Sequence, residues 1–159
     1  MIPDDPFHAG LLGGAIFCVV LAIAGGVLTR IGDWYHALRK PAWKPPDWAF
    51  GPIWTLVFFC LTFAIAHSWA EASPGQRRLL LVALAVNGIL NIAWSGIFFI
   101  MRNPPLALAE LAVFWISIMA VIIVMSGISL AAVLFTLPYI AWVSAAGVLN
   151  YQIVRLNRP

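Results

Sequence analysis

Five long apolar stretches divide the chain, and they constrain its fold more than any other feature of the sequence. They cover approximately residues 9–29, 48–69, 79–101, 106–126 and 129–154. An α-helix needs roughly 20 apolar residues to cross the hydrocarbon core of a bilayer. Only 9% of the residues are charged, against about 25% in soluble domains. The sequence therefore predicts an all-α integral membrane protein, a bundle of five transmembrane helices forming one domain over residues 1–159.

Basic residues are distributed unequally between the two ends of such a bundle. With five spans, the N-terminus shares one face with the connections at 70–78 and 126–129, where Arg77 and Arg78 lie. The opposite face holds the first connection, the 102–105 turn and the C-terminus. Its basic residues are Arg30, Arg39, Lys40, Lys44, Arg102, Arg155 and Arg158. Because basic residues favour the cytoplasmic side, we expect the first connection and the C-terminus in the cytoplasm.

The connection between the first two spans is aromatic and stiff. Residues 34–54 read WYHALRKPAWKPPDWAFGPIW and hold half of the protein's 8 tryptophans. Proline fixes φ and lacks the backbone N–H, so no ordinary helix runs through residues 41–46. The residue before each proline is also pushed towards extended geometry. We expect a folded loop with limited freedom, close to the part of the protein that carries specific chemistry.

The third span carries polar residues on one face. Asn87, Asn91 and Ser95 recur at a spacing of four, with Trp94 beside them. An amide in hydrocarbon must find a partner, so this face points into the protein. Two interpretations remain equal on spacing alone. The amides either join helices through hydrogen bonds or line a cavity.

The fifth span has a comparable face. Pro138, Trp142, Ala146 and Asn150 follow one another at steps of four residues. Residues at this spacing lie on one side of a helix. A large ring, a small residue and an amide in succession indicate the wall of a pocket.

Two further features of the spans have a structural interpretation. A stripe of small residues marks the first span at Gly10, Gly14, Cys18, Ala22 and Gly26. Such faces let membrane helices approach closely, and we expect packing within the chain in preference to a dimer contact. Glu110 is the acid inside the fourth span. An acid close to a helix start suits the helix dipole, which we expect to be its role.

The sequence lacks the motifs of most enzyme classes. It has no phosphate-binding loop, no dinucleotide glycine motif and no metal-ligand spacing among its 3 histidines. We therefore predict no catalytic residues, no metal site, no required cofactor and no nucleic-acid partner. What remains is aromatic surface, amides and a basic rim of Arg39, Lys40 and Lys44. This set suits a flat apolar molecule with an anionic edge. Composition alone favours a second interpretation, an interfacial tryptophan belt beside membrane cations that follow the positive-inside rule.

Three separated segments resemble one known family. They are WYHALRKPAWKPPDWAFGPIWT, LNIAWSGIFF and PYIAWVSAAGVLNYQIVRLNRP, and together they resemble the TspO, or tryptophan-rich sensory protein, family. The resemblance implies a five-helix bundle in a bacterial membrane, usually a homodimer, with a pocket beneath the first loop. Family members bind tetrapyrroles such as protoporphyrin IX and haem, and some bind sterols or benzodiazepine-type ligands.

The resemblance also implies a set of ligand-binding residues. By motif these are Tyr35, Trp54, Asn91, Trp94, Trp142 and Ala146, and we add Trp43 of the first connection and Asn87 from the same face as Asn91. Leu149, Tyr151 and Arg155 match a proposed sterol motif, a pattern of hypothesis grade. The sequence departs from some relatives at Leu106, where they have tryptophan.

Three functions follow from the resemblance. The first is a receptor or regulator that binds porphyrins in an interhelical pocket and contacts membrane lipid. The second is a light- and oxygen-dependent breakdown of porphyrin, with Trp142 or Trp54 as the redox partner of the ring. The third is porphyrin or sterol transport, although five short spans without broken-helix repeats argue against alternating access within one chain.

Overall fold

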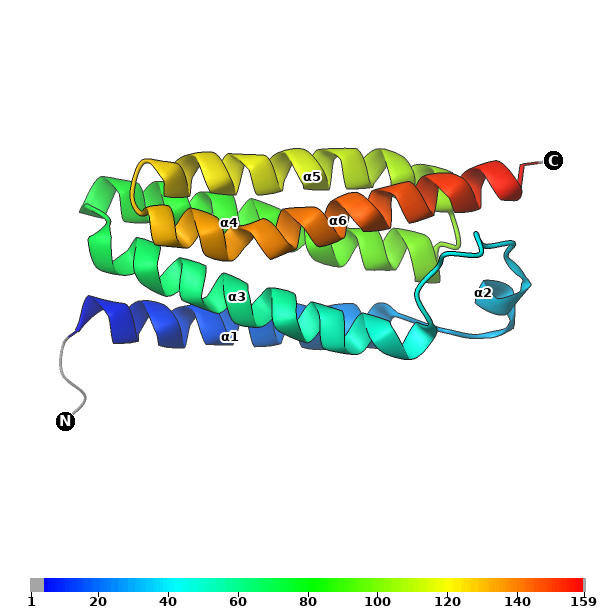
Figure 1. The fold of residues 1–159 in the computed structure, drawn as a ribbon, viewed down its shortest axis with the longest axis horizontal. Helices are drawn as coiled ribbons and strands as arrows, with labels where there is room; N and C mark the ends of the chain where they lie inside the picture. The colour runs from blue at the N-terminus through cyan, green and yellow to red at the C-terminus, as the bar shows by residue number, and fades with distance from the viewer. Residues whose placement is uncertain (1–4, 159) are drawn as a thin grey trace.

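The computed structural model describes residues 5–158 as a bundle of five long helices that run back and forth (Figure 1). These helices are α1 (Pro6–Leu28), α3 (Phe50–Glu71), α4 (Pro74–Ser95), α5 (Pro104–Ser126) and α6 (Leu130–Leu156). All five are long and apolar enough to cross a membrane. The prediction of an all-α, five-span membrane protein is therefore confirmed.

Capping residues determine where several helices begin. Asp5 accepts a hydrogen bond from the Phe7 amide, and proline follows at the first helical position of α1. Ser73 and Gln76 form a reciprocal capping box at the start of α4. Such caps satisfy amides that have no partner within the helix. α4 consequently begins at Pro74, five residues before the apolar stretch that predicted it.

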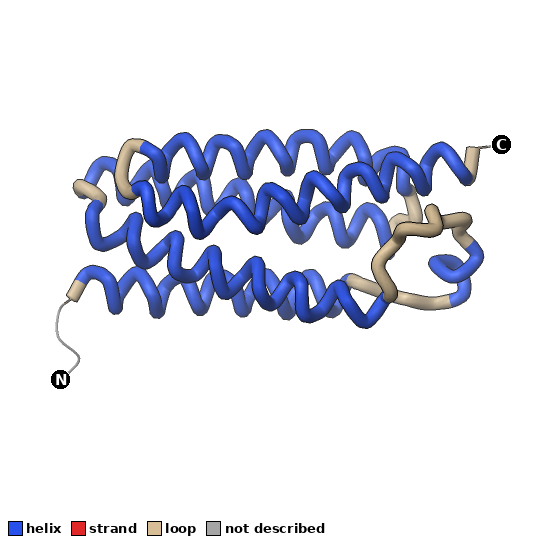
Figure 2. Tube along the Cα trace, in the orientation of Figure 1, coloured by secondary structure: helices blue, strands red, loops and turns tan. Residues whose placement is uncertain are grey.

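The first connection is folded, as its prolines indicate. Figure 2 shows it as a loop at one end of the bundle, interrupted by one helical turn. That turn is α2 (Asp33–Ala37), and a 3-10 turn, η1 (Asp47–Ala49), leads into α3. Residues 41–46 contain no helix, in agreement with the prediction. We call residues 29–49 the first loop.

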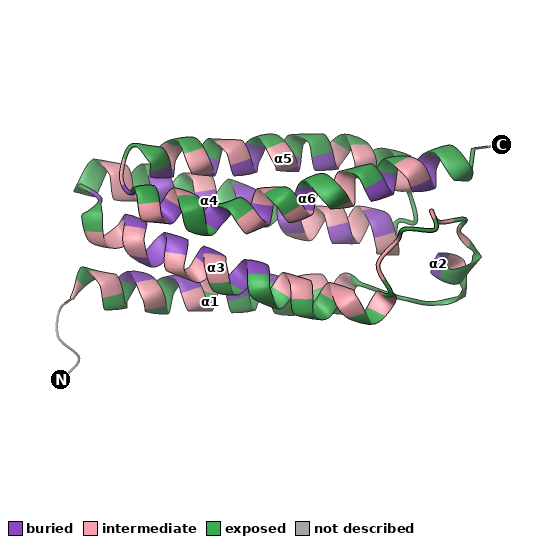
Figure 3. Ribbon diagram, in the orientation of Figure 1, coloured by how far each residue is buried: buried purple, intermediate pink, exposed green. Residues whose placement is uncertain are grey.

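The five helices form a closed ring in the order α1, α3, α6, α5, α4, with α4 returning to α1. Exposed residues lie along the outward sides of the helices, and buried residues lie between them (Figure 3). Many of the exposed side chains are large and apolar, such as Val27, Ile89 and Leu130. An outer surface of this kind suits lipid rather than water.

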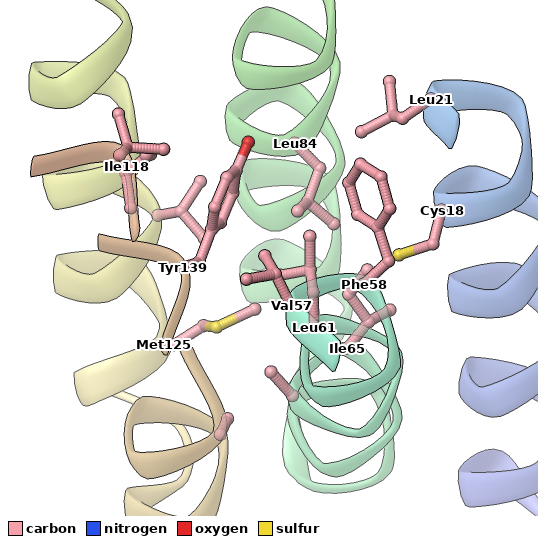
Figure 4. Close-up of a cluster of buried hydrophobic side chains, with 14 of the residues drawn as sticks. Cys18, Leu21, Val57, Phe58, Leu61, Ile65, Leu84, Ile118, Met125 and Tyr139 are labelled. Carbon is pink, nitrogen blue, oxygen red and sulfur yellow. The ribbon is translucent and has the colours of Figure 1, made fainter. Parts of the chain in front are cut away.

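Tyr139 lies at the centre of the main core. Its ring points from α6 towards Leu84 of α4, among the aliphatic side chains of α3 (Figure 4). Leu61 and Ile118, from α3 and α5, are completely buried in the same cluster. The middle of the bundle is therefore filled by completely buried side chains from several helices.

Glycines on α1 permit close contact with α3. A Cβ added at Gly10 meets Trp69 Cβ at 2.6 Å, and one added at Gly14 meets the Thr62 carbonyl oxygen at 3.1 Å. Close backbone approach of this kind is typical of small residues in membrane helices. The stripe is used for packing within the chain at these two positions, whereas an added Cβ at Gly26 meets no atom within 4 Å.

Candidate functional site

A small cavity lies beneath the first loop. Its volume is about 40 Å³, and it is lined by Tyr35, Phe50, Trp94, Phe98, Phe99, Ala146, Leu149, Asn150 and Ile153. The lining comes from five different elements of the bundle and the loop, and most of it is aromatic. The volume is far below the roughly 300–1,000 Å³ of pockets that hold small molecules. The structure thus shows the site in a closed form.

Tyr35 is the part of the first loop that reaches into the cavity. The side chain is buried, and its hydroxyl donates a hydrogen bond of 3.0 Å to Asp47 Oδ1. Burial, followed by the neighbouring carboxylate, raises the pKa of the Tyr35 hydroxyl well above its ordinary value. Tyr35 therefore keeps its proton at physiological pH and stays a donor to Asp47.

The basic rim is turned towards the loop itself. Lys44 Nζ lies 2.5 Å from Asp47 Oδ1 in an ion pair. Lys40 donates to the carbonyls of Tyr35 and Leu38 and lies 4.3 Å from the centre of the Tyr35 ring. Burial lowers the pKa of Lys40. Two of the three cations expected to face a ligand are thus already engaged in holding the loop together.

The first loop is fastened to the end of α6 by two side chains. Asn157 accepts a hydrogen bond from the Arg39 amide at 3.0 Å and donates one to the Arg39 carbonyl at 2.8 Å. Gln152 Oε1 accepts a hydrogen bond of 2.9 Å from the indole of Trp43. Trp43 is thereby placed outside the cavity, with an exposed ring. We call Asn157 and Gln152 the α6 clasp.

The floor of the cavity is built by a stacked aromatic group. Trp94 stacks on Phe98 with ring centres 5.2 Å apart, and Phe98 meets Phe99 edge to face at 4.9 Å. Phe98 and Phe99 belong to η2 (Gly96–Ile100), a π-helical turn that directly follows α4. Their motif was recognised in the sequence, yet neither phenylalanine was predicted to line the site.

Three buried polar atoms around this site have no hydrogen-bond partner among residues 5–158. They are the indole nitrogens of Trp94 and Trp142 and the Oδ1 of Asn150. Trp142 packs edge to face against Phe50 of the cavity wall, with ring centres 5.5 Å apart. Asn150 uses its other amide atom, Nδ2, to donate to the Pro104 carbonyl at 3.1 Å. Buried polar groups normally find partners, so this cluster of exceptions marks the site.

Asn87 and Asn91 lie away from the cavity, in a hydrogen-bonded network at the centre of the bundle. Asn91 Nδ2 donates to the Tyr139 hydroxyl at 3.1 Å, and that hydroxyl donates to Asn87 Oδ1 at 3.0 Å. Asn87 Nδ2 then donates to Ser117 Oγ at 2.9 Å. The network joins α4, α5 and α6. In this closed form, the two amides link helices, which is one of the two interpretations that spacing left open.

Trp54 and the residues of the proposed sterol motif do not form one wall of the cavity. Trp54 stacks on Phe58 with ring centres 5.1 Å apart, at the edge of the main core. Leu149 points into the cavity, whereas Tyr151 is 47% exposed on the outside of α6. Arg155 accompanies it there, with its guanidinium 5.9 Å from the centre of the Tyr151 ring. The structure does not bring the three motif residues together on one face.

Glu110 lies deeper in α5 than its expected role at the helix start requires. It is the seventh residue of α5, which has no acid in its first turn, and the dipole effect falls off within that turn. Both of its carboxyl oxygens are buried without a partner among the described residues. Between residues 5 and 158, no cluster of three His, Cys, Asp or Glu side chains could hold a metal ion.

Comparison with known proteins places the chain in a family. Residues 14–156 match the model of the TspO/MBR family. The chain is 34% identical over 143 residues to tryptophan-rich protein TspO of Chlorobaculum tepidum, covering 88% of this chain and 90% of the relative. It is 31% identical over 146 residues to protein CrtK of Rhodobacter capsulatus, with 90% and 91% covered. It is 30% identical over 126 residues to the translocator protein of Homo sapiens, with 78% and 75% covered. The chain therefore belongs to the TspO/MBR family, as the three sequence segments predicted.

Proposed function

We propose that this protein is a membrane receptor or regulator that binds a tetrapyrrole, such as protoporphyrin IX or haem, beneath the first loop. Membership of the TspO/MBR family supports a sensory or regulatory role in a membrane. A relative from Cereibacter sphaeroides, 32% identical over 148 residues, is named a tryptophan-rich sensory protein. The site beneath the first loop is the place in the structure that best suits a flat aromatic ligand.

The observation that carries this proposal is the group of unsatisfied polar atoms in and beside an aromatic cavity. Trp94, Trp142 and Asn150 each hold a buried polar atom without a partner. An unsatisfied buried group costs about 1–3 kcal/mol, so a ligand that supplies partners gains that energy on binding. The rings of Trp94 and Phe98 already stack on each other, and a planar ligand can stack on such faces in the same way.

Binding of a molecule as large as a tetrapyrrole requires the first loop to move. The closed cavity of about 40 Å³ is smaller than a ligand pocket by roughly an order of magnitude. The first loop is the element expected to move, because a few hydrogen bonds, such as those from the Arg39 amide to Asn157 and from Trp43 to Gln152, fasten it to the end of α6. A ligand with carboxylates would compete with the loop carbonyls and Asp47 for Lys40 and Lys44.

A fluorescence titration tests the proposal. Protoporphyrin IX added to the purified protein in detergent should quench tryptophan fluorescence in a saturable manner. Trp142→Phe should weaken binding because it removes a buried indole N–H beside the cavity. Trp48→Phe is the matched control, since Trp48 is 76% exposed and does not line the cavity. Quenching that does not saturate, or that Trp142→Phe and Trp48→Phe alter equally, would contradict the proposal.

The same preparation separates binding from breakdown. Illumination of the saturated complex in air should leave the porphyrin absorbance unchanged relative to free porphyrin in the same detergent. A faster, protein-dependent loss of absorbance would instead indicate the photo-oxidative alternative. In that case Trp142→Phe should slow the loss.

A further inference from the structure

A second and larger hollow lies at the opposite end of the bundle from the first loop. Its volume is about 270 Å³, and it lies between α1, α3 and α4. The residues that matter here are Gly13 and Phe17 of α1, Ile65 and Trp69 of α3, and Leu81 and Ala85 of α4. We call this hollow the α1–α3–α4 groove. The helix segments that line it lie towards the end of the bundle where α1 begins (Figure 1).

Gly13 keeps the groove open. An added Cβ at Gly13 meets no atom within 4 Å, whereas one at neighbouring Gly10 or Gly14 meets α3 closely. The absence of a side chain at Gly13 therefore does not serve contact between helices. It leaves apolar space in the wall of a transmembrane bundle.

The mouth of the groove carries a fixed positive charge. The Arg77 guanidinium lies 5.1 Å from the centre of the Trp69 ring, and its Nε donates to the Trp69 carbonyl at 3.2 Å. Arg77 and its exposed neighbour Arg78 are the basic residues of this membrane face. Among residues 5–158, neither arginine has a carboxylate within ion-pair distance. The acids that the structure describes on this face are engaged elsewhere, Glu71 by Ser129 and Asp5 by His8.

We propose that the α1–α3–α4 groove binds an anionic phospholipid. One acyl chain fills the apolar groove along Gly13, and the headgroup phosphate is bound by Arg77 and Arg78. The match is one of charge and shape: an apolar slot that opens onto two unpaired guanidinium groups at the depth of the headgroups. Arginine forms bidentate hydrogen bonds with phosphate, and stacking on Trp69 holds the Arg77 group in place for it.

The test compares two lipids that differ only in the headgroup. Purified protein in detergent is titrated with dioleoylphosphatidylglycerol or dioleoylphosphatidylcholine, and native mass spectrometry counts the lipids that stay bound. The rise in melting temperature is measured in parallel. The wild-type protein should retain phosphatidylglycerol at a concentration about tenfold lower than phosphatidylcholine, as expected when cations lie beside an anionic headgroup. Equal retention of the two lipids would overturn the proposal.

Variants locate the site. Gly13→Leu should fill the groove and abolish the tightly bound lipid, while Gly26→Leu should not, because Gly26 lies on the same helix, also in open space, but outside the groove. Arg77→Gln with Arg78→Gln should abolish the preference for phosphatidylglycerol. Arg155→Gln with Arg158→Gln removes the same charge from the opposite face and should preserve the preference. If both double variants lose it equally, the preference belongs to the whole surface and the proposal is wrong.

The mass of the complex distinguishes lipid from a second copy of the chain. If Gly13→Leu converts a dimer into a monomer and leaves lipid retention unchanged, the groove is a contact between subunits and the lipid proposal fails. Lipid loss from Gly13→Leu at an unchanged oligomeric state supports it. Porphyrin binding under the first loop is independent of either result.

Discussion

Ala146 is a single residue at which room for a ligand can be separated from helix packing. It lines the cavity beneath the first loop, one turn from Trp142 and from Asn150 on α6. Threonine adds two heavy atoms there, and its hydroxyl can bond to the Trp142 carbonyl within the helix. Overpacking of this size typically costs about 1–3 kcal/mol. Because the space belongs to the cavity, we expect that cost to fall mainly on ligand binding.

The expected result for Ala146→Thr is a loss of protoporphyrin IX affinity of roughly tenfold or more, with a nearly unchanged melting temperature in the absence of ligand. Fluorescence titration and thermal unfolding on one preparation measure both quantities. Ala145→Thr is the matched control, because Ala145 is the exposed neighbour on the same helix. A lower melting temperature at unchanged affinity would place Ala146 in a packing contact instead.

At Tyr139 we expect a loss of stability without a loss of ligand affinity, because its hydroxyl connects two buried amides. Tyr139→Phe leaves Asn87 Oδ1 and Asn91 Nδ2 without their shared partner. An unsatisfied buried group costs about 1–3 kcal/mol, and polar contacts between membrane helices average about 0.6 kcal/mol. We therefore expect lower thermal stability with unchanged porphyrin affinity. A selective loss of affinity would assign Asn87 and Asn91 to the ligand site after all.

The first loop is the element whose motion should control access to the site. Asn157 holds both backbone groups of Arg39, so Asn157→Ala removes two hydrogen bonds at once. We expect faster porphyrin association and faster amide hydrogen exchange in residues 29–49, because the closed form loses stability. Arg155→Ala is the control, since Arg155 lies on the same turn and faces Tyr151 rather than the loop. Unchanged association and exchange in Asn157→Ala would show that the clasp does not hold the loop closed.

Helices and turns could be predicted from the sequence only where a local pattern of residues specifies them. Apolar length predicted all five spans, but the start of α4 at Pro74 depends on the capping box of Ser73 and Gln76, in a stretch where the hydropathy is low. The π-helical turn closes with a hydrogen bond from the Met101 amide to the Gly96 carbonyl. This wider turn rotates the residues near it out of the α-helical register. A period of 3.6 residues therefore could not predict that Phe98 and Phe99 line the site.

The partners of the first loop were hidden for a different reason. Trp43 and Gln152 are separated by 109 positions, and Arg39 and Asn157 by 118. Nothing in the local pattern relates residues so far apart. Trp43 was included among the expected ligand contacts, but in this structure its indole donates a hydrogen bond to Gln152 of α6.

The whole molecule has two chemically different ends. The first loop, the α4–α5 turn and the end of α6 lie together at one end, and the N-terminal side of α1 lies with the other turns at the opposite end (Figure 1). This arrangement agrees with the grouping of basic residues made from the sequence. The two proposed sites are separated in the same way, because the cavity lies beneath the first loop and the α1–α3–α4 groove lies towards the opposite end.

The orientation of the whole bundle in the membrane can be tested directly. The end with the first loop carries most of the Lys and Arg residues, and such residues are retained on the cytoplasmic side during insertion. Gly32 in the first loop and Gly75 in the first turn of α4 are both exposed, and an added Cβ at either meets no atom within 4 Å. Gly32→Cys and Gly75→Cys are therefore matched probes of the two ends that leave the fold intact. Cys18 and Cys60 lie inside the spans α1 and α3, where a polar reagent does not reach them.

In intact bacterial cells, a membrane-impermeant maleimide should label Gly75→Cys at once and Gly32→Cys only after permeabilisation. The reverse pattern would invert the bundle, and it would place the tetrapyrrole site on the side facing away from the cytoplasm.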